Sequence, residues 1–522
     1  MNRKGLSLFL ATALALFLVP TLLSILSHTQ TAHAATFTVN IFHDENDQIC
    51  DSSCSLRDAI FAAGNGDDIT IPAGTYTLSA TNGTLTDYDS ISFNGNSAAD
   101  TLNDAQSNSR VFNVTAGTVI FNNLTIQNGA ATEGGGIRVS GTATNLTLNN
   151  SNVADNAATA NGAGIFVIGA TTNLTLNNST VISNNASTNG GGIYLQSGSL
   201  ALQNSEVMTN TAVSGGGGIY IFRGAVTNDN SSINYNSADQ GGGVFVNQDT
   251  ASFTLNSGEI AFNTGDLTST FPGGGLFVGS GTATLNGGEI KFNQAFRGAG
   301  VLVSSGQVTL NNAQIISNTA SYGGGVYVRE TAGWFTQTAG TIATNQSTAT
   351  DFGGGGLYVF NGNAALLGGS VVTNTAVFNG GGVEVRFGTL LVDGTTFADN
   401  QSGAMGGGIY NSGGMVTVQN SLISGNTASS GGGIATSYEA GEGGTGPSQT
   451  LIENSAIIAN EAGSTAAGGG IAVHNVSGSL GGVITLTNVT LSGNLAGSGA
   501  GLATAQGSTA TLTNVTISEN SA

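Results

Sequence analysis

Several residue types are scarce in this chain. Its 522 residues include two Cys, four Pro and one Trp, and only 8% of them are charged. Two thiols without a second pair make a poor zinc site. The 82 Gly follow no G-x-y period, which excludes collagen, and the abundant Ile, Val and Leu argue against disorder. We therefore expect a folded chain.

Long apolar runs are also missing after the N-terminus. Residues 1–34 combine the positive start "MNRKG", an apolar stretch at 6–26 and the small-x-small sequence Ala32-His33-Ala34. This pattern predicts a cleaved signal peptide, and hence an extracellular or cell-surface location, with outer-membrane association as one form of it. The alternative is an uncleaved anchor, because the apolar stretch is long enough to span a bilayer. No membrane span is expected in the mature chain.

Basic residues are few. Of ten Lys and Arg, Arg3 and Lys4 lie in the leader, which leaves eight against 30 Asp and Glu, a net charge of −22. Such an acidic surface repels phosphate backbones and anionic lipid headgroups, so nucleic acid is not an expected partner. The charges are spread thinly, which favours solubility of an exposed rod as their role.

Both cysteines lie in "CDSSCSLRDAI", at Cys50 and Cys54. Three intervening residues can close a small loop, and export meets an oxidising compartment. We expect a disulfide rather than a metal pair.

A glycine triplet, GGG or GAG, returns fourteen times, and seven of the thirteen spacings are 25 or 26 residues. An aliphatic residue follows every triplet, so each triplet is expected to open a strand. Two further apolar patterns per unit predict three short strands, which bury their apolar faces only when units stack. The predicted fold is all-β: a right-handed parallel β-helix, a pectin-lyase-like solenoid of about fifteen coils over residues 81–522. A β-propeller is the rival, but its blades need about 40 residues.

One of these patterns ends in Asn before each triplet. Asn tolerates the left-handed region and bonds locally to backbone, which suits a corner. We expect a structural stack in which each side-chain amide bonds to the next coil. Its members include Asn156, Asn210, Asn236, Asn318 and Asn374.

Residues 35–80 are expected to cap the first coil. Ser55 and Asp58 have capping-box spacing, which predicts a helix at 55–63 whose Leu56, Ile60 and Phe61 cover the open end. Residues 69–78 would form the first strands. At the other end the sequence stops after an Asn corner, so we expect a truncated chain or a last coil protected by a cap or partner.

These motifs resemble two groups of bacterial proteins. "CDSSCSLRDAI" followed by "ITIPAGTYTL" is similar to the N-terminal domain of secreted proteins named for the phrase CSLREA, with Asp58 in place of Glu. The triplets and the aliphatic-x-x-Asn corners resemble repeats of the chlamydial polymorphic outer membrane proteins, although only "FADN" at 397–400 matches FxxN in full at a repeat corner. The resemblance implies an exported β-helix with an adhesive role and transfers no catalytic residue.

The sequence offers only weak candidates for catalytic residues. Glu259 and Glu289 precede their corner Asn by four residues on consecutive coils, with Lys291 on the same face. Stacked carboxylates would raise one pKa and suit acid–base work or calcium, so a polysaccharide lyase or glycoside hydrolase is the alternative function. The favoured interpretation is that Lys291 offsets two solvated glutamates.

A second acidic group lies in "DENDQICD", where Asp44, Glu45, Asp47 and Asp51 offer oxygen ligands. Calcium prefers such ligands, but the spacing is not that of an EF-hand. A solvated loop is favoured, with calcium as the possible cofactor and no other cofactor expected.

The middle residue of each triplet-associated strand faces away from the core, and eight of the fourteen are aromatic. Stacked coils place them in one row, which either stabilises itself by ring stacking or binds a ligand. We favour a non-enzymatic adhesion or carbohydrate-binding protein whose partner is a polysaccharide or cell-surface glycan. The row comprises Phe166, Tyr194, Tyr220, Phe245, Phe277, Tyr327, Tyr358 and Tyr410.

Overall fold

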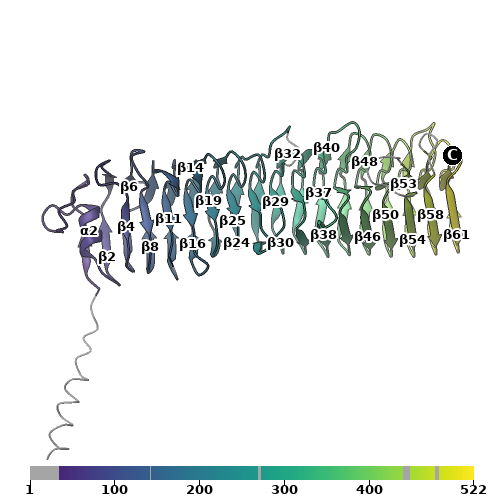
Figure 1. Ribbon diagram of the computed structural model, residues 1–522. Coiled ribbons are helices and arrows are strands. Elements are labelled where there is room, and N and C mark those ends of the chain that lie inside the picture. Colours follow the sequence, from purple (N-terminus) through teal and green to yellow (C-terminus); the bar gives the residue numbers. More distant parts are fainter. Residues whose placement is uncertain (1–33, 142, 269–271, 439–446, 476–480) are drawn as a thin grey trace, which may run out of the picture.

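The computed structural model describes residues 34–522 except 142, 269–271, 439–446 and 476–480. The expected signal peptide lies outside these residues apart from Ala34. The described chain winds into one right-handed parallel β-helix, a straight stack of coils that runs from α2 at one end to β61 at the other (Figure 1). The predicted fold class is confirmed.

One coil shows the repeating plan. After the glycine triplet come β19 (Ile193–Leu195), β20 (Ser199–Gln203) and β21 (Glu206–Met208), and after the corner residue Asn210 comes the short β22 (Thr211–Ala212). The same order returns in the coil before it, whereas the coil after it has three strands and only an isolated bridge at Ser237 in place of the fourth. Each triplet therefore opens a strand, as the sequence predicts.

Three long ladders stack these strands along the rod. One has 18 strands, with β1 (Thr36–Thr38) and β61 (Thr509–Thr513) at its ends. A second has 16 strands, from β4 (Leu85–Asp87) to β60 (Leu502–Thr504), and from β11 (Ile137–Val139) onward each of its strands follows a triplet. The third runs from β3 (Gly74–Thr77), and all three pair in parallel. Equivalent residues therefore lie one above another.

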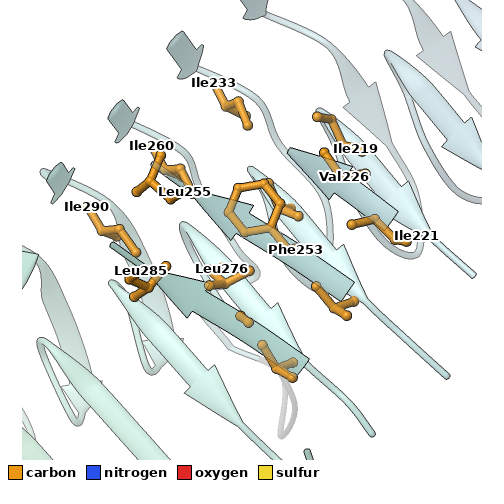
Figure 2. Packing of buried hydrophobic residues seen from close by; sticks show 14 of the residues in the cluster. Ile219, Ile221, Val226, Ile233, Phe253, Leu255, Ile260, Leu276, Leu285 and Ile290 are labelled. Atoms are coloured by element: carbon orange, nitrogen blue, oxygen red, sulfur yellow. The ribbon is translucent and has the colours of Figure 1, made fainter. Parts of the chain in front are cut away.

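The interior is a continuous apolar column. In β23 (Ile219–Ile221) and β27 (Ala251–Leu255), the side chains of Ile219, Ile221 and Phe253 point inward toward the same space (Figure 2). Burying each such side chain stabilises the fold by about 1.5–3 kcal/mol. No coil could bury these faces alone, so stacking is what makes the fold stable.

The predicted asparagine stack is confirmed. Asn318 Nδ2 donates to Asn345 Oδ1 at 3.0 Å and to the Ile290 carbonyl at 2.9 Å, while Asn318 Oδ1 accepts from the backbone N–H and side chain of Asn293 at 3.0 Å. The third triplet glycine lies against this ladder, since a Cβ on Gly325 would be 2.9 Å from Asn345 Nδ2. Triplet and asparagine are thus two sides of one corner.

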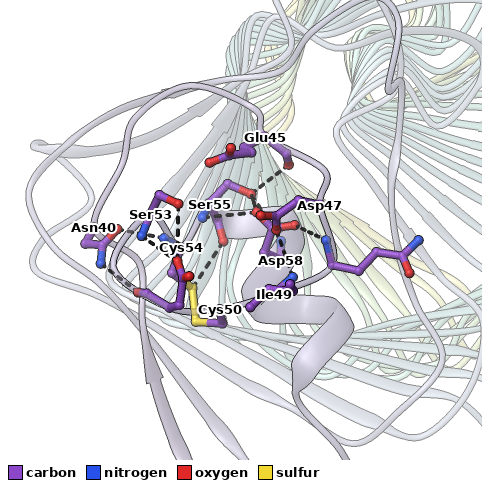
Figure 3. The surroundings of a disulfide bond; sticks show 11 residues. Asn40, Glu45, Asp47, Ile49, Cys50, Ser53, Cys54, Ser55 and Asp58 are labelled. Atoms are coloured by element: carbon purple, nitrogen blue, oxygen red, sulfur yellow. Dashed lines mark hydrogen bonds between the residues drawn. A yellow bond between two sulfur atoms is a disulfide. The ribbon is translucent and has the colours of Figure 1, made fainter.

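The N-terminal segment forms a capped helix and a disulfide. Helix α2 (Leu56–Ala62) has Ser55 as N-cap, with the full capping box to Asp58. Cys50 and Cys54 are joined beside it, which confirms the predicted pairing (Figure 3).

Two details of the predicted cap are wrong. Leu56 is buried and Ile60 packs on the core, but Phe61 is 61% exposed and so does not cover the open end. The first strand is not within 69–78: β1 precedes the helix and pairs with β2 (Asp68–Ile71).

Candidate ligand-binding surfaces

The side chains of the eight predicted aromatic residues point away from the interior apolar column, yet they are not exposed to solvent. Seven of them form a separate buried cluster with Leu302, here called the buried aromatic row. Their exposed fractions run from 1% for Phe166 to 8% for Tyr194. Tyr410, fully buried, is set apart from the row because Glu384 replaces a ring between them. This burial fits the alternative in which the row stabilises itself by ring stacking, and leaves little ring surface for a ligand.

The corner glycines explain this burial. A Cβ on Gly190 would be 2.8 Å from Tyr194 Cβ, and one on Gly215 would be 2.7 Å from the Phe245 ring. The corner backbone thus packs directly over the rings. Burial raises the pKa of the Tyr220 hydroxyl to about 12.

Ring stacking within the row is confirmed. Centroids are 5.3 Å apart for Phe166 and Tyr194, 5.0 Å for Tyr194 and Tyr220, and 4.5 Å for Phe245 and Phe277. The row is a second, smaller core outside the first.

The candidate carboxylates lie side by side and share one cation. Glu259 in β28 (Gly258–Ala261) and Glu289 in β31 (Glu289–Lys291) are in register. Lys291 Nζ lies 3.0 Å from Glu259 and 2.5 Å from Glu289. Partial burial opposes ionisation, but hydrogen bonds from Asn234 and Lys291 outweigh it and lower the pKa of Glu259. The expected raised pKa is wrong for Glu259, and the offsetting role of Lys291 fits the geometry.

The side chains of the acidic loop accept hydrogen bonds from backbone N–H groups and from one arginine. Arg57 binds both carboxylate oxygens of Asp44, at 2.8 and 3.0 Å. Asp47 and Asp51 each accept a backbone N–H two residues on, and the Glu45 carbonyl accepts the Ser55 hydroxyl. In the part of the chain that the structure describes, no three His, Cys, Asp or Glu side chains converge as metal ligands would.

A different set of aromatic rings does face solvent. Tyr235, Phe262 and Phe292 are 53%, 40% and 45% exposed, and we call them the exposed aromatic row. They lie on consecutive coils, with centroids 4.9 and 5.0 Å apart and ring planes within 17° of parallel. They were not among the predicted site residues, although each directly precedes a corner Asn.

The backbone makes this row unusual. Its three residues have φ of 55°, 56° and 54°, the left-handed region, where a bulky side chain is an outlier. Other coils place a small or polar residue at the same corner, such as Ser183, Thr209 or Ser317. Neither backbone preference nor burial favours rings here.

Polar groups flank the exposed aromatic row. Asn234 and Lys291 immediately precede Tyr235 and Phe292, and Asn234 Nδ2 donates to Glu259 at 2.7 Å. The row therefore has hydrogen-bonding donors and acceptors along one edge.

Comparison with known proteins gives one match. A family model described as a right-handed β-helix region matches residues 325–522. It agrees with the fold. No curated protein and no solved structure matches the chain. The resemblance to CSLREA proteins and to the chlamydial repeats stays a prediction.

No helix among the described residues has the length and apolar character needed to cross a membrane.

Proposed function

We propose that this protein is an exported, non-enzymatic β-helix that binds carbohydrate through the exposed aromatic row. The observation that carries the proposal is three stacked, solvent-facing rings at corner positions where the backbone disfavours them. Strained conformations persist where the surrounding structure imposes them, and they cluster at functional sites.

The chemistry of the row suits a polysaccharide. The rings form a flat apolar strip that sugar faces can cover, and a contiguous apolar patch on a soluble protein marks a contact surface. Asn234, Lys291 and the two glutamates beside the strip can bond sugar hydroxyls. Extracellular or cell-surface location is part of the proposal and rests on the pattern of residues 1–34.

Hydrolysis at the glutamate pair is less well supported. A glycosidase needs one carboxyl that stays protonated as the general acid. The lowered pKa of Glu259 does not suit that role, and Lys291 forms ion pairs with both glutamates.

The test replaces the rings with residues that other coils already use. In the triple variant Tyr235→Ser, Phe262→Thr and Phe292→Ser, we expect polysaccharide binding on a glycan array, confirmed by calorimetry, to weaken by about 1–3 kcal/mol or more. The melting temperature should stay the same or rise, because Ser and Thr suit the corner better.

The matched control is Trp334→Thr, since Trp334 is 42% exposed but lies on another sheet, in β38 (Trp334–Gln337). Its binding should equal that of the parent. Unchanged glycan binding by the triple variant would contradict the proposal.

A further inference from the structure

The rod carries a pocket in which arginines gather. Its volume is about 280 Å³, and it opens beside β37 (Val326–Arg329), β41 (Leu357–Phe360) and β45 (Val383–Arg386). Arg297, Arg329 and Arg386 line it. These are three of the eight basic residues that follow the leader, in a chain with 30 acidic ones.

Coil stacking places two of these arginines in one row. Arg329 pairs with Phe360, and Phe360 pairs with Arg386, so guanidinium, ring and guanidinium follow one another on three coils. With strands about 4.8 Å apart, the two arginine backbones are roughly 10 Å apart. A single small ligand can reach both.

Aromatic rings orient two of the guanidinium groups. Arg386 Cζ lies 3.7 Å from the Phe352 centroid, and Arg297 Cζ lies 5.6 and 5.8 Å from the Tyr322 and Tyr327 centroids. A guanidinium group stacked on a ring keeps its N–H groups in its own plane, where they can donate to an incoming acceptor. Arg386 Nε is buried and has no hydrogen-bond partner among the described residues.

Nearby carboxylates accept hydrogen bonds from other groups, although Glu330 also pairs with one pocket arginine, Arg329. Asp351, which lines the pocket, accepts the Tyr322 hydroxyl at 3.1 Å. Glu330 lies 3.0 Å from Arg329 and also accepts two serine hydroxyls. Glu384, buried beneath Tyr358, accepts the Gly353 N–H at 2.6 Å.

The lining and the volume of the pocket restrict the class of ligand further. Tyr322 and Phe360, both partly exposed, form an apolar wall beside the arginines, as in pockets that hold a ring and fix it with a few polar groups. The volume lies at the small end for ligand sites, which suits one sugar residue. Arginine's planar fork matches the two oxygens of a carboxylate.

We infer that this pocket binds one acidic sugar residue, with its ring against the aromatic wall and its carboxylate on the arginines. The site is separate from the exposed aromatic row and does not depend on it. Residues 346–353, which make the corner between Asn345 and the next triplet longer than in the preceding coil, contribute Asp351 and Phe352 to the pocket.

The experiment compares sugars that differ only at C6. Glucuronic acid, its methyl ester, glucose and glucose 6-sulfate are titrated into the full mature chain by calorimetry or ligand-observed NMR. We expect glucuronate to bind at least about tenfold more tightly than its neutral ester or glucose, and to weaken as salt rises. Equal affinity for all four, or binding of none, would overturn the inference; tighter binding of the sulfate would replace the carboxylate with a sulfate ester.

Variants test the residues. Arg386→Gln should weaken glucuronate binding about tenfold, and Arg386→Lys should recover only part of it because lysine lacks the fork. Arg223→Gln is the control, since Arg223 also stacks on a ring, 5.0 Å from Phe222, but lies outside the pocket. Equal losses in Arg386→Gln and Arg223→Gln would refute the assignment.

A variant of one site is expected to lose binding at that site alone. The triple variant of the exposed aromatic row should bind glucuronate normally, and Arg386→Gln should keep the polysaccharide binding of the row. A joint loss, with an unchanged melting temperature, would contradict the separation of the sites.

Discussion

Asp87 closes β4 near the N-terminal end of the rod and is only 2% exposed. Its Oδ1 accepts the Asp89 N–H at 3.0 Å, whereas Oδ2 is buried with no partner among the described residues. Burial raises the pKa of this carboxyl from 3.8 to about 6. A buried carboxylate with one unpartnered oxygen lowers the stability of the fold when it is charged.

This predicts a pH dependence. Between pH 4 and 6 the folded chain holds a proton that the unfolded chain releases, so the free energy of unfolding falls as pH rises through this range. Asp87→Asn should remove a fall on the order of 2 kcal/mol. In calorimetric melting at pH 4.5 and 7.5, the melting temperature of the variant relative to that of the parent should be higher at pH 7.5. Asp249→Asn, at an exposed position, is the control; the same offset at both pH values for Asp87→Asn would contradict the assignment.

At the residue scale, the sequence predicts the role of residues that recur at the same position in each coil. Asn318 and its equivalents recur at one place in each unit, so their stack follows from corner chemistry and coil stacking. The exposed aromatic row does not follow from the repeat, because Tyr235, Phe262 and Phe292 occupy a corner position that is small or polar in other coils.

The strand after each triplet is the element whose surroundings the sequence predicts least well. Alternation correctly turns Tyr194 away from the core, but alternation carries no information about what lies over it. The cover comes from the corner backbone at Gly190, and its closeness depends on positive φ at that glycine. The arginine pocket escaped notice for a similar reason: Arg297, Arg329 and Arg386 are far apart in sequence, and only coil stacking joins them.

Burial of this element predicts a stability effect. Tyr194→Ala with Tyr220→Ala should lower the melting temperature clearly, since emptying a buried aromatic site costs about 3–5 kcal/mol. Polysaccharide binding at temperatures where the variant stays folded should not change. Tyr88→Ala, at a ring that is 68% exposed, serves as the comparison. If the double variant melted like the parent, the buried aromatic row would not be a second core.

The whole molecule is a one-dimensional stack, in which each coil contacts its neighbours. Asn184 and Asn210 are 26 residues apart and equivalent. Deleting residues 184–209 therefore joins Ser183 to Asn210, keeps the asparagine ladder and brings Ile165 opposite Ile219.

We expect this deletion to yield a soluble protein with a β-rich circular dichroism spectrum and a melting temperature close to that of the parent. Deleting only 184–196 should fail, because it removes half a coil and breaks every ladder at once. Equal behaviour of the two deletions would show that the coils are not the units of stability.

Each strand ladder bonds one coil to the next, so the backbone hydrogen bonds of the ladders point along the axis of the rod. Tension applied to the two ends would load the junctions between coils in series, and the weakest junction would open first. Each 26-residue coil would then release roughly 90 Å of extended chain. Such a rod would lengthen in steps under load and dissipate work, instead of breaking at a single force.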